Sequence, residues 1–215
     1  MRFVSRTEAG RLLGEQLQTA DVQADLVLGL PRGGVVVAAE VAQILACPLA
    51  TLVVRKIGHP HHREMAVGAI AEPDVIVFDD ESLRWSPPSN AELDAVELEE
   101  IQRLHHYQKL FHPAGMPDLN GKNVLLVDDG LATGATMDAA VRAARKREAA
   151  RVTVAVPVAS AHAMARLQRR ADGVIALVVD EEFAAVGRYY ETFTQVDDAE
   201  VVALLKAAAR NLQSG

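Results

Sequence analysis

The residues best suited to chemistry are two adjacent carboxylates followed by a turn of small residues. Asp128 and Asp129 come directly after the apolar run 124–127, and the sequence Gly-Leu-Ala-Thr-Gly-Ala-Thr follows at 130–136. A turn of small residues at a helix start exposes successive backbone N–H groups, which the helix dipole reinforces, so it can hold an anion. Carboxylates beside it can accept hydrogen bonds from vicinal hydroxyls and can approach a divalent cation. A phosphate beside a diol describes a ribose 5-phosphate.

Other phosphate motifs fit this segment less well. A Walker loop needs the pattern GxxxxGK[ST], and Ala135 stands where its lysine would be. A dinucleotide-binding fold needs GxGxxG after the first strand, whereas the chain has Gly-Leu-Pro-Arg-Gly-Gly at 29–34. An ordinary Asp–Gly turn after a buried strand is the structural alternative, and the Thr-Gly-Ala-Thr sequence at the helix start disfavours it.

The elements that must position these residues alternate along the chain. Short apolar, β-branched runs predict strands at 25–30, 49–55, 65–70, 75–78, 124–127, 152–158 and 174–179. Helical patterns separate several of them, at 35–46, 135–149 and 160–170, and a further amphipathic helix spans 197–212. The alternation predicts an α/β fold with a doubly wound, mainly parallel central sheet flanked by helices. In such a sheet ligands bind beyond the carboxyl ends of the strands.

Length and composition limit the class of protein. The 215 residues are 50% hydrophobic and 24% charged, which predicts a folded chain, and we expect 1–215 to form a single domain. Two segments lie outside the alternation: a helical insertion at 80–120, with Ser89 or Asn90 as N-cap, and a hood with a C-terminal helix at 180–215.

Charge and cysteine content favour a soluble protein of the cytoplasm that does not bind nucleic acid over a broad face. A net charge of −7 disfavours a broad nucleic-acid-binding face. No apolar run reaches the roughly 18 residues of a membrane helix, and the N-terminus lacks the pattern of a signal peptide. The single cysteine, Cys47, excludes an internal disulfide and fits a reducing compartment.

The run VLLVDDGLATGAT resembles the phosphoribosyl-diphosphate (PRPP) binding signature of the type I phosphoribosyltransferases. Residues 30–34, Leu-Pro-Arg-Gly-Gly, are similar to the pyrophosphate-binding loop of that family. Arg55 and Lys56 stand where many members carry a basic residue directed at pyrophosphate. The resemblance covers about 24–180 in the family's order, and the whole chain resembles a bacterial subgroup of predicted phosphoribosyltransferases. It implies the type I phosphoribosyltransferase fold and the transfer of a phosphoribosyl group to a nitrogenous base or related small acceptor.

The resemblance also implies a role for each motif. Asp128 and Asp129 would hold the ribose hydroxyls and the region of a hydrated Mg2+ ion, the expected cofactor, bound through substrate or water. The residues implied at the 5-phosphate are Gly130, Ala132, Thr133, Gly134, Ala135 and Thr136. Those implied at pyrophosphate are Arg32, Gly33, Gly34, Arg55 and Lys56. Departure of pyrophosphate through an oxocarbenium-like transition state needs positioning and charge neutralisation, which assigns catalytic roles to Asp128, Asp129, Lys56 and Arg32.

The segment 57–66 is the candidate for a lid that excludes water. Its polar residues are His59, His61, His62 and Arg63. The His-x-His-His pattern also leaves a zinc site open, although no cysteine or carboxylate completes a recognised motif.

Two departures from the family pattern bear on the acceptor. The 6-oxopurine members carry an aspartate at the position of Ala132 and a lysine near 156–158, and this chain has neither, so hypoxanthine and guanine are disfavoured. Four of the chain's nine aromatic residues lie within eleven positions: Phe183, Tyr189, Tyr190 and Phe193. They are candidates for stacking on the acceptor base, and packing of the hood on the core is the alternative.

Two other functions remain open. The basic residues Arg142, Arg145, Lys146, Arg147 and Arg151 form either a solvated helix face or a patch for RNA or a protein partner. The patch would suit a non-catalytic regulator that senses PRPP. A phosphoacceptor domain is a weaker third hypothesis. A homodimer is a candidate assembly that the sequence does not decide.

Overall fold

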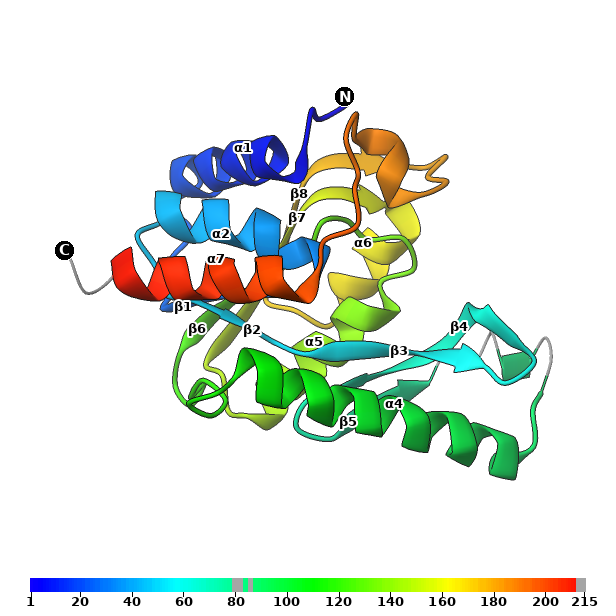
Figure 1. Ribbon diagram of the computed structural model, residues 1–215. Helices are drawn as coiled ribbons and strands as arrows, with labels where there is room; N and C mark the ends of the chain where they lie inside the picture. The colour runs from blue at the N-terminus through cyan, green and yellow to red at the C-terminus, as the bar shows by residue number, and fades with distance from the viewer. Residues whose placement is uncertain (79–82, 85–86, 212–215) are drawn as a thin grey trace.

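Five parallel strands form the central sheet of the computed structural model, which describes residues 1–78, 83–84 and 87–211. The strand order is β2-β1-β6-β7-β8 (Figure 1). The strands are β1 (Leu26–Gly29), β2 (Leu49–Thr51), β6 (Asn123–Val127), β7 (Arg151–Ser160) and β8 (Gly173–Asp180). Strands that are covered on both faces are apolar throughout, which is why β1 and β6 appear as continuous apolar runs in the sequence. The predicted parallel α/β sheet is confirmed.

Helices cover both faces of this sheet. α1 (Arg6–Thr19) and α2 (Gly33–Ile44) pack on the face that carries Val27 and Leu125. α5 (Ala135–Lys146) and α6 (Ala161–Leu167) pack on the opposite face, against Leu126 and Val154. α7 (Asp198–Asn211) runs alongside α2 in the same layer (Figure 1). None of the described helices is both long enough and apolar enough to cross a membrane.

A second, antiparallel sheet projects from the core and forms a hood. Its strands are β3 (Val54–His59), β4 (His62–Ala71) and β5 (Val75–Phe78), in that order. The run 49–55, predicted as one strand, is therefore divided between β2 of the parallel sheet and β3 of the hood. The runs 65–70 and 75–78 are antiparallel rather than part of the parallel alternation. The reason is connection length: two or three residues join these strands, whereas a parallel crossover needs about a dozen or more.

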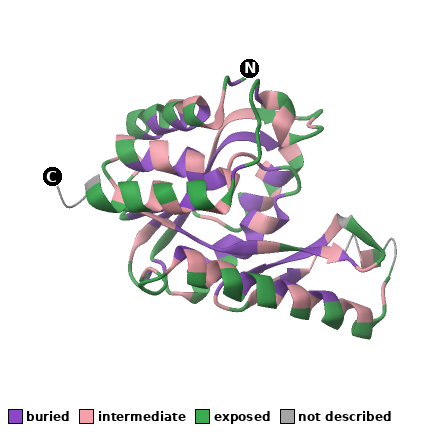
Figure 2. Cartoon of the chain, viewed as in Figure 1, coloured by how far each residue is buried: buried purple, intermediate pink, exposed green. Residues whose placement is uncertain are grey.

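The predicted helical insertion is α4 (Asn90–Phe111), which lies along the hood sheet (Figure 1). Ser89 is its N-cap and forms a reciprocal capping box with Glu92. The outer face of α4 is exposed (Figure 2), but Val96, Leu104 and Phe111 are buried against the hood. The insertion is thus a structural part of the hood. Residues 180–211, where a hood was expected, instead form β8's last residue, the short helix η1 (Val186–Tyr189) and α7, which packs on α2.

Candidate functional site

The carboxylate pair lies where the parallel sheet brings two loops together. Asp128 and Asp129 follow the last residue of β6, and Val127 is paired in register with Gly29 at the end of β1. The N–H of Leu30 donates to the carbonyl of Val127 over 2.9 Å. The loop 30–34, expected at pyrophosphate, therefore starts beside the two carboxylates.

Two glycines allow this close approach. A Cβ on Gly33 would lie 2.1 Å from Asp129 Oδ2, and a Cβ on Gly34 would lie 2.7 Å from Asp128 Oδ1 and 2.8 Å from its Cα. A side chain at either position would overlap the acidic pair. Close packing of the start of α2 against the end of β6 therefore accounts for both glycines at the site itself.

Asp129 is held by Arg6, which sequence reasoning missed, and by Tyr190, which was expected to stack on the acceptor base instead. Arg6, the first residue of α1, donates from Nε to Asp129 Oδ2 over 2.7 Å, and the two side chains are only 11% and 16% exposed. The Arg6 Nη1 also donates to the carbonyl of Thr194 over 2.7 Å. The hydroxyl of Tyr190 donates to the backbone carbonyl of Asp129 over 2.6 Å. The side chain of Asp129 is thus fixed by α1, and its backbone by the segment that follows η1.

The acidic pair is poorly solvated. Burial raises the pKa of Asp128 well above its usual range, and the neighbouring charge of Asp129 raises it further. Burial also raises the pKa of Asp129, while the Arg6 guanidinium opposes that rise. Such carboxylates gain from a partner that replaces lost water, and the hydroxyls of a sugar or a hydrated cation are partners of this kind.

The turn 130–136 has the shape of an anion cradle. Gly134 adopts a left-handed conformation, with φ of 75°, immediately before α5 begins at Ala135. Ser160 at the end of β7 fixes the turn, because its hydroxyl donates to the carbonyl of Ala132 over 2.6 Å. Thr133 is exposed on the turn. The residues predicted to bind the 5-phosphate are thus contiguous on one ordered turn.

The helices that start at this site differ from others in the molecule. Serine side chains cap α1, α4 and α6 at their N-termini. In the described part of the chain, no side chain caps the N-terminus of α2 or of α5. The first N–H groups of a helix have no acceptor within the helix. At α2 the N–H of Val35 donates to the Arg32 carbonyl over 3.1 Å, and at α5 the N–H of Ala135 donates to Thr133 Oγ1 over a long 3.4 Å. In the described part of the chain the N–H groups of Gly33, Gly34 and Thr136 have no such acceptor, so they are available to an anion beside the acidic pair.

The cations expected at pyrophosphate do not act as one group. Arg55 and Lys56 are consecutive in β3, so their side chains point to opposite faces of the hood sheet. Arg55 lies on the α4 side, where its Nε donates to Glu100 Oε2 over 3.0 Å. Lys56 is exposed and lies on the same face as Val54, which packs with the α5 cluster. Arg32 pairs loosely with Asp198 of α7, at 3.6 Å.

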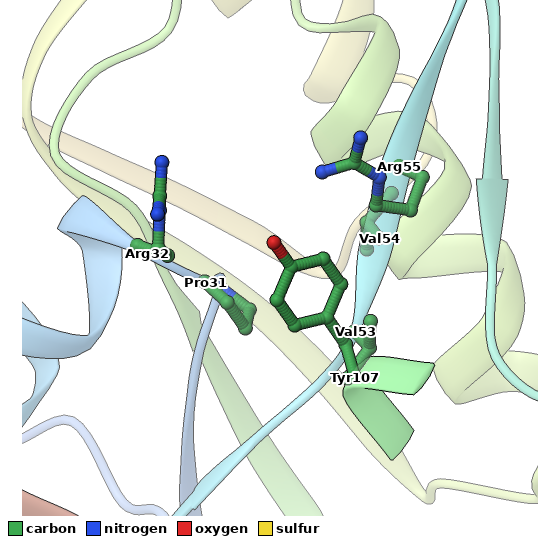
Figure 3. Close-up of a pocket in the computed structure, with 6 residues that line it drawn as sticks. All are labelled: Pro31, Arg32, Val53, Val54, Arg55 and Tyr107. Atoms are coloured by element: carbon green, nitrogen blue, oxygen red, sulfur yellow. The ribbon is translucent and has the colours of Figure 1, made fainter. Parts of the chain in front are cut away.

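A cavity of about 250 Å³ lies between the loop 30–34 and the hood. Its lining residues are Pro31, Arg32, Val53, Val54, Arg55 and Tyr107 (Figure 3). Tyr107 comes from α4 and was not predicted as a site residue. The cavity joins the end of β1 to the start of β3.

The candidate lid is a β-hairpin rather than a loop. His59 ends β3 and is buried, and His62 begins β4. His61 contacts Glu92 at 2.9 Å and Arg63 contacts Glu99 at 2.9 Å, so α4 holds the hairpin from one side. Within the described residues, no three His, Cys, Asp or Glu side chains are grouped as metal ligands. The hairpin histidines therefore give no support to the zinc alternative.

The aromatic cluster forms packed pairs. Tyr190 is 1% exposed and packs between Phe3, at 5.5 Å between ring centroids, and Phe193, at 5.1 Å. The guanidinium of Arg6 lies 3.8 Å from the centroid of the Phe193 ring. Tyr190 was expected as a base-stacking candidate, and this expectation is wrong because neighbouring rings enclose it. The alternative, packing on the core, describes Tyr190 better, although the segment that carries it is not part of the hood.

The two remaining aromatic candidates stack on each other. The rings of Phe183 and Tyr189 are 5.3 Å apart and nearly parallel, and both are half-buried. Tyr189 donates its hydroxyl hydrogen bond to Asp180 at the end of β8. This pair, with the partly exposed Phe193, keeps the stacking role as a prediction.

The basic stretch after the cradle is partly paired within the chain. Arg142 contacts the buried Asp138, Arg145 contacts Asp172 at 2.7 Å, and Lys146 contacts Asp74 at 2.6 Å. Arg147 is half-buried and donates to the carbonyl of Pro117. Asp138 is also shared with Arg166 and Arg170, and Arg151 is exposed, so the stretch is partly ion-paired and keeps an excess of positive charge. The partial pairing is typical of a solvated helix face, and the patch for RNA or a protein partner stays a prediction.

Comparison with known proteins adds to this geometry. The family model described as "Phosphoribosyl transferase domain" matches residues 5–191. A Mycobacterium tuberculosis protein named "Putative phosphoribosyl transferase" is 43% identical over 210 residues, which are 97% of this chain and 47% of that protein. The chain therefore spans about half the length of the curated relatives it matches.

Two solved structures have a fold similar to that of this chain. The crystal structure of TT1426 from Thermus thermophilus is 43% identical, with a TM-score of 0.78, and the match covers 95% of this chain and 98% of that one. The AQ2163 protein from Aquifex aeolicus has a TM-score of 0.53 at 14% identity, over 85% of this chain and 76% of that one. The second match concerns the fold alone.

Proposed function

The chain belongs to the phosphoribosyl transferase domain family, and on this premise we propose that it transfers the 5-phosphoribosyl group of PRPP to a nitrogenous base or related small acceptor, releasing pyrophosphate. The observation that carries the proposal is the meeting of two uncapped helix N-termini at a poorly solvated carboxylate pair. A sugar that carries a phosphate at one end, a diol in the middle and a diphosphate at the other end matches these three features in order.

Each group of the substrate has its own partner in this proposal. The 5-phosphate accepts hydrogen bonds from the N–H groups at the start of α5 and from the hydroxyl of Thr133. The ribose hydroxyls donate to Asp128 and Asp129. The diphosphate lies against the loop 30–34 and the start of α2. Binding in this order fixes C1 of the sugar between its leaving group and the acceptor, so catalysis is mainly positioning and charge neutralisation.

The donor set at the acidic pair fits a magnesium ion that is held mostly by substrate. Asp128 and Asp129 are two adjacent carboxylates, and within the described residues no third His, Cys, Asp or Glu joins them. Mg2+ keeps several waters and binds through one or two carboxylates plus substrate phosphates in many sites. When bound, it would neutralise charge on the departing diphosphate.

The basic stretch at 142–151 is only partly ion-paired, so a PRPP-sensing regulator of RNA or of a protein partner is kept as the alternative function. The absence of an acidic side chain at Ala132 continues to disfavour 6-oxopurines as acceptors. A cytoplasmic location and a homodimer stay predictions.

Ligand-induced thermal stabilisation tests this function without a prior choice of acceptor. PRPP with Mg2+ should raise the melting temperature, because a ligand that binds only the folded state stabilises it by mass action. The Asp128→Asn/Asp129→Asn double variant should lose that increase. A panel of nucleobases should then give pyrophosphate release with at least one base. Binding of PRPP with no release for any base would overturn transfer and favour the regulator, and absence of PRPP binding would overturn both.

A further inference from the structure

Helix α4 contributes a tyrosine to the cavity beside the loop 30–34. Tyr107 lines this cavity together with Arg32 and Arg55, and its hydroxyl points toward the space between the two guanidinium groups (Figure 3). We propose that Tyr107 binds the diphosphate group of the substrate and that Glu100, about two turns earlier in α4, positions Arg55 for the same anion. This proposal rests on the proposed function and adds the insertion helix to its leaving-group end.

The Tyr107 ring is held in place, whereas its hydroxyl is unused. The ring stacks on Phe111 at 5.4 Å with an interplanar angle of 18°, and the guanidinium carbon of Arg55 lies 5.5 Å from the ring centroid. Among the described residues, none forms a hydrogen bond with the Tyr107 hydroxyl. A phenylalanine would supply the same packing, so the hydroxyl is the part that packing does not explain.

Glu100 restricts the orientation of Arg55. The Glu100 carboxylate is 6% exposed and accepts from Arg55 Nε over 3.0 Å and from Arg103 Nη1 over 2.6 Å. In the part of the chain that the structure describes, the hydrogen bond that Arg55 donates goes from its Nε to Glu100. The Arg55 Nη1 and Nη2 groups remain as a donor fork at the cavity (Figure 3).

The charges around the cavity select an anion. Two guanidinium groups and a hydroxyl line it, and no carboxylate is among the described residues of its lining. Glu100 is shared between Arg55 and Arg103, and Glu99 between Arg103 and Arg63, so the network of three arginines and two glutamates keeps a net positive charge. The loose 3.6 Å contact between Arg32 and Asp198, both about one-third exposed, leaves Arg32 able to turn toward a ligand. A diphosphate meets these donors better than a neutral base does.

Binding of two substrate fragments separates this proposal from the proposed function. Inorganic pyrophosphate with Mg2+ tests the cavity, and ribose 5-phosphate tests the carboxylates and the cradle, each measured by calorimetric titration. Tyr107→Phe should weaken pyrophosphate binding about tenfold, the size of one hydrogen bond to a charged group, and leave ribose 5-phosphate binding unchanged. Glu97→Gln is the control on α4, because Glu97 has no polar partner among the described residues and does not line the cavity; it should change neither affinity.

The role of Glu100 needs a readout that simple destabilisation would not give. Glu100→Ala should weaken pyrophosphate binding about tenfold, and Glu100→Gln should restore most of it, because an amide oxygen still accepts from Arg55 Nε. Ribose 5-phosphate binding should stay unchanged in both. If the wild type binds both fragments and Tyr107→Phe binds pyrophosphate as the wild type does, the inference about α4 is wrong and the proposed function stands. If the wild type binds neither fragment nor PRPP, both are wrong.

Discussion

Replacing Gly33 with alanine tests the contact between the loop 30–34 and the acidic pair. The added Cβ would lie 2.1 Å from Asp129 Oδ2 and 2.7 Å from Arg6 Nε. An ordinary contact between such atoms is about 3.4 Å, so the carboxylate oxygen must retreat by about 1.3 Å. That displacement breaks the 2.7 Å hydrogen bond between Arg6 and Asp129, since Arg6 is blocked by the same methyl group.

The expected cost follows from these contacts. A hydrogen bond between charged groups contributes about 1.5–3 kcal/mol, and overpacking adds about 1–3 kcal/mol. Because the obstructing atom is the end of a side chain that can rotate, we expect Gly33→Ala to lower the free energy of unfolding by about 2–3 kcal/mol. In Gly34→Ala the Cβ would meet backbone as well, with Asp128 Cα at 2.8 Å and the Val127 carbonyl at 2.9 Å. That variant should lose about 4 kcal/mol.

Urea unfolding gives these free energies, and Gly173→Ala is the matched control. The nearest atom to a Cβ at Gly173 is 3.4 Å away, so this change should shift stability by less than about 0.5 kcal/mol. Gly33→Ala should fold and yet lose the increase in melting temperature given by PRPP with Mg2+. If Gly33→Ala keeps wild-type stability and the full ligand response, the reasoning that Gly33 must lie against Asp129 is refuted.

Three further changes probe the same carboxylates. Asp128→Asn should raise the free energy of unfolding by about 1 kcal/mol near neutral pH while abolishing the PRPP response. The sign follows from the raised pKa of Asp128, because the folded protein binds a proton at this carboxyl more tightly than the unfolded chain does. Stability is therefore lost as pH rises from the ordinary carboxyl value of 3.8 through the raised pKa. A plot of melting temperature against pH should accordingly have a flatter slope for the variant than for the wild type. Arg6→Met should destabilise the chain by about 2–3 kcal/mol and raise the pKa of Asp129 further, which NMR titration of the carboxyl carbon would detect. Tyr190→Phe should cost about 1–2 kcal/mol in urea unfolding, because the carbonyl of Asp129 loses its 2.6 Å hydrogen bond; no change would mean that water replaces the hydroxyl.

The parallel sheet and the cradle could be predicted because their signals are local. Each buried strand is a run of apolar residues, and the residues of the cradle are contiguous at 130–136, so their spacing in sequence is their spacing in space. The antiparallel hood could also have been found from connection length. Two residues separate β3 from β4, too few for a crossover helix, and strand alternation likewise separates Arg55 from Lys56.

Long-range contacts had no such signal. Arg6 is 123 positions from Asp129, and Tyr190 is 61 positions from it. Nothing in the neighbourhood of Arg6 distinguishes it from the other arginines of an amphipathic helix. Glu100 and Tyr107 read as residues of an exposed insertion because the helix pattern does not reveal that α4 lies along β3. Only the fold joins these side chains to the site.

The groups proposed to bind a phosphosugar also lower the stability of the protein when no ligand is bound. In the described part of the chain, no N-cap side chain forms a hydrogen bond at the start of α2 or α5, and two adjacent carboxylates have lost solvation, with the Arg6 guanidinium paired to one of them. A capping side chain contributes about 1 kcal/mol over most residues but only a few tenths over glycine, which is the N-cap of α5. A ligand at about 100 times its dissociation constant adds about 2.7 kcal/mol of stability. Serine side chains satisfy the starts of α1, α4 and α6, whereas the starts of α2 and α5 lie where a bound anion can satisfy their N–H groups.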